Sequence, residues 1–181
     1  SFPLPDISTN QNSAERQYDI VWCGRTTVSK GFDVFIRIAA ELSKADIAKR
    51  IAIVGSTNIK NTARLTQSSG LGDQVDIFGQ LPPDQLPPIL TKSKIALFPS
   101  RNDAYGAVAL ASPLPGCAPD ILRDPEILPI DNPQGWITAC KRLLDAPQLL
   151  EDTRLHQARE IANSTPAHHS DTMWQAVHQA V

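Results

Sequence analysis

The sequence predicts a doubly wound α/β domain, in which helices cover both faces of a parallel sheet. Short apolar segments rich in valine, isoleucine and phenylalanine alternate along the chain with segments of helical periodicity. The apolar segments contain few polar positions, which is typical of parallel strands that are buried on both sides. Strands that alternate with helices form parallel sheets with right-handed connections. With 181 residues and 41% hydrophobic content, the chain is large enough for one sizeable core.

Four strands are expected, and each is short and apolar. Three of them end at or near a glycine or a proline, residues that commonly mark the end of a strand. The loops that follow parallel strands meet at one edge of the sheet, and doubly wound sheets bind their ligands at that edge. The expected strands are 19–23, 50–55, 75–79 and 94–99.

The first expected helix, 32–44, has an apolar face made of Val34, Phe35, Ile38, Ala39 and Leu42. Shorter helices are expected over 62–70, where Gly70 is the stop signal, and over 83–93. The second of these requires its two prolines to lie in the first turn, where a missing N–H does no harm.

The pattern turns helical after Asn132, over 132–146, 149–163 and 170–181. In the last of these segments Met173, Trp174 and Val177 recur at roughly helical spacing, and we interpret them as packing residues rather than a site.

Residues 1–17 have no apolar period and are predicted to be a linker from a missing N-terminal domain, so that the folded domain spans 18–181. The chain does not begin with methionine, and we therefore expect it to be a piece of a longer protein.

Composition excludes several classes of protein. Seventeen Lys and Arg against nineteen Asp and Glu give a net charge of -2, which argues against nucleic-acid binding through bulk charge. Three widely spaced cysteines, Cys23, Cys117 and Cys140, form neither a complete disulfide framework nor a metal-ligand pair. No apolar run approaches the roughly 20 residues that cross a bilayer. A cytoplasmic location is expected.

The first loop combines glycines and cations at the point where a strand should give way to a helix. Gly24 allows close backbone approach, Arg25 offers a planar fork of donors, and Lys30 and Gly31 precede the helix. A helix N-terminus with nearby cations can hold a phosphate group. The alternative is a solvated loop with two surface cations. The pattern is neither a P-loop nor Gly-x-Gly-x-x-Gly.

A resemblance adds to this pattern. The segments "WCGRTTVSKGFDVFIRIA", "IAIVGS" and "QVDIFGQLPPDQLPPILTKSKIALFPSRNDAYGAVAL" appear in the order typical of the donor-binding domain of GT-B glycosyltransferases of retaining family 4. The match covers roughly residues 19–110. The resemblance implies a Rossmann-like domain, the C-terminal half of a GT-B enzyme.

The resemblance also implies the site residues. Arg25 and Lys30 would contact the diphosphate of the donor and stabilise the charge that develops on it, and Asp103 would take the place of the first glutamate of the family's Glu-x7-Glu motif, near the sugar hydroxyls. We predict these three as the catalytic residues. The predicted donor-binding residues are Gly24, Gly55, Ser56, Phe78, Gly79, Gln80, Tyr105, Gly106 and Ala107.

Structural roles remain open for several of these residues. Gly55 and Gly79 are also what ordinary strand ends look like, Tyr105 is as compatible with packing as with a ligand, and Asp103 after Asn102 fits a helix cap. Aspartate is one methylene shorter than the family's glutamate, so its carboxylate is retracted from the sugar.

The resemblance breaks after Leu110. Ala111 stands where the second glutamate is expected, and about ten residues of the family pattern are missing. Either a mobile loop with that glutamate belongs to the protein but is missing from this sequence, or the deletion is real. We favour the loop, because loss of a central strand would expose apolar edges and exceed a domain's typical stability of about 5–15 kcal/mol.

The implied activity is transfer of a sugar, with retention, from a nucleotide diphosphate sugar to an acceptor hydroxyl. The resemblance implies a UDP- or GDP-sugar donor, no metal cofactor, and a role in surface polysaccharide, lipopolysaccharide or glycolipid synthesis. The acceptor would be held by the N-terminal domain, which would also supply any contact with the inner face of the membrane. This chain alone is expected to bind donor but to transfer little sugar.

Rival functions come from other classes. A true loss of the second glutamate would favour a non-catalytic module that binds a nucleotide sugar or a partner. A dinucleotide-dependent enzyme is disfavoured because the glycine fingerprint is missing, and a hydrolase because the Gly-x-Ser-x-Gly elbow is missing. The four histidines, His156, His168, His169 and His178, lie in no matched motif.

Overall fold

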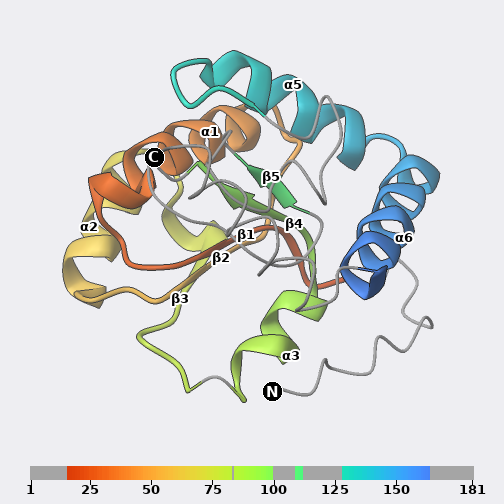
Figure 1. Cartoon of the computed structure of the whole chain (residues 1–181). Coiled ribbons are helices and arrows are strands. Elements are labelled where there is room, and N and C mark those ends of the chain that lie inside the picture. Colours follow the sequence, from red (N-terminus) through yellow and green to blue (C-terminus); the bar gives the residue numbers. More distant parts are fainter. Residues whose placement is uncertain (1–15, 83, 100–108, 112–127, 164–181) are drawn as a thin grey trace, which may run out of the picture.

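Parallel strands form a sheet in the order β3-β2-β1-β4-β5 within the part of the chain that the computed structural model describes, residues 16–82, 84–99, 109–111 and 128–163 (Figure 1). All adjacent pairs are parallel, with Val21 opposite Ala52 and Ile20 opposite Ile95. The predicted doubly wound α/β fold is confirmed. The strands are β1 (Tyr18–Cys23), β2 (Ile51–Val54), β3 (Val75–Ile77), β4 (Ser93–Phe98) and β5 (Ala109–Ala111).

The first four strands lie within the predicted segments or extend one residue beyond them. The predicted strands ended one or two residues too late, at Gly55, Gly79 and Pro99, because the chain has already entered loops there. The fifth strand was not predicted. It contributes three residues to the edge beside β4, where Leu97 pairs with Leu110.

The expected segment between Leu110 and Ala111 does not exist, and the preference for a missing loop was wrong. The two residues are consecutive members of β5, in a continuous chain of 181 residues. The physical objection to a deletion was an uncovered edge on β4, and β5 covers that edge with the residues that are present. In this continuous chain the resemblance puts Ala111 where the second glutamate is expected.

The helices follow the predicted order. They are α1 (Phe32–Lys44), α2 (Ile59–Ser68), α3 (Leu86–Thr91), α5 (Pro133–Leu144) and α6 (Pro147–Asn163). The bounds of α1 match the prediction. Helix α2 begins earlier than expected because the side chain of Asn58 caps it, accepting a hydrogen bond from the Asn61 amide at 3.0 Å. The two prolines of α3 lie in its first turn, as required. The expected helix 170–181 lies outside the described residues.

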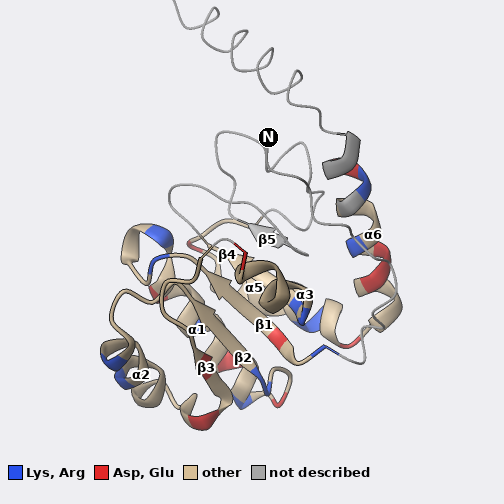
Figure 2. Cartoon of the chain, turned by 90° about the horizontal axis from the view of Figure 1, so that it is seen from below, with Lys and Arg blue, Asp and Glu red and all other residues tan. Residues whose placement is uncertain are grey.

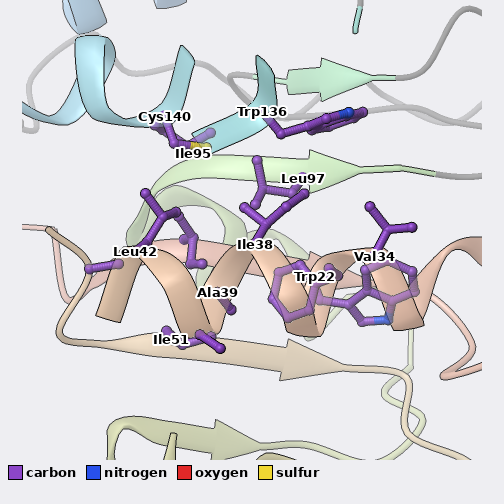
Figure 3. Packing of buried hydrophobic residues seen from close by; sticks show 14 of the residues in the cluster. Trp22, Val34, Ile38, Ala39, Leu42, Ile51, Ile95, Leu97, Trp136 and Cys140 are labelled. Carbon is purple, nitrogen blue, oxygen red and sulfur yellow. The ribbon is translucent and has the colours of Figure 1, made fainter. Parts of the chain in front are cut away.

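Alternate residues of the strands point to opposite faces of the sheet, and a separate core covers each face. On one face α1 and α5 pack on Ile20, Ile53, Leu97 and their neighbours. Figure 3 shows Val34, Ile38 and Leu42 of α1 in this layer, with Trp136 and Cys140 of α5 above it. On the other face Val21, Val54 and Phe98 pack with residues of α3. Figure 1 shows α1 and α5 together on one side of the sheet and α3 on the other.

Arg16, placed within the predicted linker, contacts the domain. Its guanidinium donates to the Ser93 carbonyl at 3.3 Å and lies 3.8 Å from a carboxylate oxygen of Glu151 on α6. The remainder of the predicted linker up to residue 15 lies outside the described residues, as does the segment 164–181.

Charges of both signs are mixed on the described surface. Arginine and acidic residues follow one another along α6 (Figure 2). No helix in the described ranges is both long enough and apolar enough to span a bilayer.

Candidate anion-binding site

The first loop connects the carboxyl end of β1 to the start of α1, as predicted. It contains a single 3-10 turn, Val28–Lys30, and ends at Gly31. The carbonyl of Thr27 accepts hydrogen bonds from the Lys30 amide (3.1 Å) and the Phe32 amide (3.2 Å), so the loop is wound tightly into the helix. The Arg25 side chain is exposed and that of Lys30 is partly exposed. The two cations therefore lie on one short loop at a helix N-terminus, which is the arrangement that attracts an anion.

Trp22 holds the beginning of this loop, a role that the sequence analysis missed. Its indole N–H donates to the Gly24 carbonyl at 2.8 Å, directly before Arg25. The ring is 2% exposed and contacts Phe32 and Phe35, with ring centroids 5.2 and 5.3 Å away. The loop is thus tied to the core by a polar atom of a buried ring. The sequence did offer a signal for this role, because Trp22 is the next-to-last residue of a buried strand and lies two residues before a glycine.

Gly31 holds the other end of the loop against the sheet. It has a φ of 77°, in the left-handed region, and a β-carbon at this position would lie 1.6 Å from the carbonyl oxygen of Pro99. Pro99 directly follows β4. The start of α1 therefore lies against the end of β4, and only glycine allows this approach.

The second and third loops are connected to the first through their backbones. Gly55 has a φ of 93°, and a β-carbon there would lie 2.6 Å from the Gly24 carbonyl oxygen. The Gly24 amide donates to Val54 O at 3.0 Å, and the Gly55 amide donates to Gly79 O at 3.0 Å. The ends of β1, β2 and β3 therefore form one continuous backbone surface. The structure brings together the predicted residues Gly24, Gly55 and Gly79 along it. Arg25 directly follows Gly24, whereas Lys30 lies at the other end of the first loop, next to Gly31.

The side chains of Ser56 and Phe78 make contacts within the domain. The Ser56 side chain is buried and its hydroxyl is 2.8 Å from that of Thr62. The Phe78 ring is partly buried in the core under α3. Their backbones extend the pairing of β2 and β3, because the Ser56 amide donates to Phe78 O at 3.2 Å. Gln80, the next predicted residue but one, is exposed. The predicted residues Asp103, Tyr105, Gly106 and Ala107 lie outside the described residues.

Two cysteines are described in the structure, Cys23 at the end of β1 and Cys140 on α5, away from the first loop. Burial raises the pKa of the Cys23 thiol, and burial raises that of Cys140 to about 12, so both thiols stay protonated at neutral pH. Among the described residues, His, Cys, Asp and Glu form no group of three or more that could hold a metal ion.

Comparison with known proteins places this geometry among glycosyltransferases. The chain is 26% identical over 185 aligned residues to a D-inositol 3-phosphate glycosyltransferase of Rhodococcus opacus, covering 91% of this chain and 42% of the relative. The chain thus spans about two fifths of the length of that curated relative.

Solved structures share the fold at lower identity. The structure of Staphylococcus aureus TarM with fondaparinux, α-GlcNAc-glycerol and UDP is similar with a TM-score of 0.72 and 18% identity, covering 89% of this chain and 35% of that chain. The C-terminal domain of the group 1 family glycosyl transferase LpcC of Francisella tularensis has a TM-score of 0.69 and 17% identity, covering 86% of this chain and 93% of that domain.

The family model for glycosyl transferases group 1 matches residues 5–112, which is more than half of the chain. The match includes the first loop, the ends of β1 to β4 and part of the predicted linker. The predicted resemblance to GT-B enzymes is confirmed. The chain belongs to the glycosyl transferases group 1 family, and its sheet and helices are those of a Rossmann-like domain of the GT-B fold.

Proposed function

We propose that the chain binds the nucleotide diphosphate sugar donor of a family 4 enzyme, which transfers the sugar with retention to an acceptor hydroxyl. The observation that carries this proposal is the placement of Arg25 and Lys30 on one loop between β1 and α1. The family membership supports it, because glycosyl transfer needs a site for a charged donor.

The chemistry follows from the charge that transfer creates. When the glycosidic bond breaks, negative charge grows on the leaving diphosphate. A guanidinium, an ammonium and a helix N-terminus that are already in place stabilise this charge without reorganising at the moment of reaction. Trp22 and Gly31 would act as positioning residues, since they hold the two ends of the loop.

The remaining predicted roles belong to the same proposal. Gly55 and Gly79 would let the backbone approach the nucleotide, and the amides of Tyr105, Gly106 and Ala107 would contact phosphate and sugar. Asp103 would contact the sugar hydroxyls. We propose that catalysis needs no metal, since cations and the helix dipole neutralise the diphosphate. Donor binding should then be unchanged by EDTA.

The donor base, the acceptor and the cellular role are proposed from the relatives. One relative is named a D-inositol 3-phosphate glycosyltransferase, and the TarM structure is a complex that includes UDP. We propose a UDP- or GDP-sugar donor, an acceptor site on a second domain, and polysaccharide, lipopolysaccharide or glycolipid synthesis at the cytoplasmic face of the membrane.

A second candidate function is a non-catalytic module that binds the nucleotide sugar. The observation that favours it is Ala111, which lies within β5 and stands where the resemblance leads us to expect the second glutamate. Sugar transfer or donor hydrolysis by the longest natural form of the protein would favour the enzyme. Tight donor binding without any turnover, across a panel of acceptors, would favour the module.

The donor site can be tested by calorimetric titration of the chain with UDP, GDP and ADP. One nucleotide should bind, and the Arg25→Ala, Lys30→Ala double variant should bind it at least about 30-fold more weakly, because charge-assisted hydrogen bonds are lost. The matched control is Lys141→Ala, Arg142→Ala. It removes the same charges from the exposed last turn of α5, beyond Cys140, which Figure 3 shows at the end of the sheet away from the loop.

Two results would contradict the proposal. One is a folded wild-type chain that binds none of the three nucleotides. The other is an equal loss of affinity in the double variant and its control, which would mean that net charge, rather than the loop, governs binding.

A further inference from the structure

Charged side chains join the beginning of the described chain to α6. The Arg16 guanidinium donates to the carbonyl of Ser93, the first residue of β4, and lies 3.8 Å from a carboxylate oxygen of Glu151. Figure 1 shows the red beginning of the described chain beside α6. Since β4 begins here, this contact lies at the amino edge of the sheet. The contact is therefore separate from the candidate anion site, which lies at the carboxyl edge.

Arg16 is buried but incompletely hydrogen-bonded. Its side chain is 8% exposed, and its Nε–H has no hydrogen-bond partner in the part of the chain that the structure describes. A buried donor without a partner costs free energy. Burial and the neighbouring charge of Arg154 also lower the pKa of Arg16, because both disfavour its positive charge. The guanidinium is therefore held in its buried position at a cost.

Glu151 does not depend on Arg16 for a partner. The Nε–H of Arg154, one turn further along α6, donates to both carboxylate oxygens of Glu151 at 3.0 Å. The hydrogen bond from Arg154 is the main cause that lowers the pKa of Glu151, and the charge of Arg16 contributes less. If Arg16 leaves, the pair within α6 stays complete, and water reaches the Nε–H that is unpaired when buried. The docked and released positions of Arg16 therefore differ little in free energy.

Helix α6 has few apolar contacts that could replace Arg16. Beyond Leu150, the only fully buried residue in the described part of α6 is Gln157, which is polar. Side-chain pairs within the helix support it instead, such as the hydrogen bond from Gln148 to Asp152 at 3.0 Å. The contact with Arg16 therefore matters for how α6 is attached to the sheet.

We propose that Arg16 is a latch that ties the segment entering β1 to α6, and that it opens while the sheet stays folded. In the closed state it holds α6 against the start of β4. In the open state Glu151 keeps Arg154, and Arg16 lies in water. The coupling is reciprocal, so a change that displaces Arg16 loosens α6, and a change in α6 frees Arg16. This latch does not depend on the proposed donor site.

Trypsin measures the opening from the side of Arg16. Trypsin cleaves after an arginine whose side chain can enter its specificity pocket, so cleavage between Arg16 and Gln17 requires the latch to be open. Mass spectrometry follows the product that begins at Gln17. Glu151→Gln removes the charge that attracts Arg16, and this cleavage should become about three-fold faster. The matched control is Asp152→Asn, at the adjacent exposed position, which should leave the rate unchanged. Equal rates in Glu151→Gln and the wild type would overturn the latch.

Hydrogen exchange measures the opening from the side of α6. Arg16→Met keeps an aliphatic side chain and removes the guanidinium, so the amides of α6 should exchange about three-fold faster while those of β1 and β2 keep their rates. Arg37→Met, at an exposed position of α1, should change neither and serves as the control. Unchanged exchange of α6 in Arg16→Met would show that Arg16 does not hold this helix. Equal acceleration in α6 and the strands would mean that Arg16 supports the whole domain and is no latch.

Discussion

Gly31 is the residue whose chemistry most constrains the candidate site. Other glycines of the chain share its left-handed backbone conformation; Gly70, for example, has a φ of 78°. What distinguishes Gly31 is the Pro99 carbonyl, which occupies the space of a β-carbon. At Gly70 nothing lies within 4 Å of that position. Comparing alanine substitutions at Gly31 and Gly70 therefore separates the free-energy cost of a left-handed backbone from the cost of a steric clash.

Gly31→Ala should destabilise the domain by about 3 kcal/mol or more, whereas Gly70→Ala should cost about 1–2 kcal/mol. Both variants incur the penalty of a left-handed alanine, and Gly31→Ala must also move the end of β4 away from α1. Urea unfolding followed by circular dichroism measures the difference. Equal penalties for the two variants would show that the contact with Pro99 relaxes at little cost.

Trp22 links the core to the first loop, which carries Arg25 and Lys30. Trp22→Phe should therefore affect both stability and nucleotide binding. Loss of ring volume and of the hydrogen bond to Gly24 should cost about 1–3 kcal/mol. Without this hydrogen bond the first loop is less restrained, and nucleotide binding should weaken about three- to ten-fold, because binding must then also order Arg25 at a cost in entropy. Unfolding and calorimetry on the same samples measure the two effects.

Trp136→Phe is the matched control. Trp136 is equally buried, and its indole donates to the Pro129 carbonyl at 2.9 Å rather than to the loop. It should lose stability without losing nucleotide affinity. Similar losses of affinity in both variants would mean that Trp22 acts only through global stability.

At the scale of elements, the two edges of the sheet are held by different interactions. The carboxyl edge is joined by backbone contacts between glycine loops, as described above. Side chains join the amino edge. Lys94 on β4 lies 2.7 Å from Asp19 on β1, the Tyr18 hydroxyl donates to Asp76 on β3 at 2.9 Å, and Arg50 donates to the same carboxylate at 3.1 Å. Burial and the bond to Asp76 raise the pKa of Tyr18 to about 12. Charges are thus used for stability at the edge away from the candidate site.

The Asp19 carboxylate should make the stability of this edge depend on pH. Burial alone would raise its pKa, but hydrogen bonds from Lys94 and the amides of Lys49 and Arg50 outweigh burial, and the pKa is lowered. A lowered pKa in the folded state means that the stabilisation is present above the unfolded value, about 3.9, and is lost as pH falls through the folded value.

Asp19→Asn should therefore cost about 2 kcal/mol at pH 6 and less at pH 3, which is below the unfolded value. Urea unfolding at the two pH values measures this, with the exposed Asp84→Asn as the control that removes a carboxylate elsewhere. A penalty for Asp19→Asn that does not change with pH would exclude the carboxylate as the source of the stabilisation.

At the scale of the whole molecule, the proposed ligand would join loops that come from different strands. Anything that binds only the folded chain raises its stability, and a ligand at 100 times its Kd adds about 2.7 kcal/mol. For a domain of this size the melting temperature should then rise by about 5–10 °C. Differential scanning fluorimetry with the nucleotide identified by calorimetry measures the rise.

The rise should disappear in Arg25→Ala, Lys30→Ala at the same nucleotide concentration and persist in Lys141→Ala, Arg142→Ala. A shift of the same size in the double variant would mean that the nucleotide stabilises the domain from another site.

Much of the architecture could be predicted because it depends on local signals. Helix α1 carries its apolar positions at helical spacing, and the buried strands are short runs of apolar residues between loop residues. The two cations of the first loop stand next to a strand end in the sequence, so their place at the helix start also followed. Strand β5 could not be predicted in this way, because its three residues gain their partner only from β4, and the expected intervening segment does not exist.

The sequence alone was sufficient for the fold class, the order of strands and helices along the chain, the family resemblance and the location of the first loop with its two cations. Each depends on residues that are close together in the chain, where spacing and residue type carry the information. Tertiary structure alone revealed that Gly31 lies against Pro99 and that Gly55 lies against Gly24. These contacts join residues that are distant in sequence, and their distances are set by how neighbouring strands pack, which no local pattern encodes.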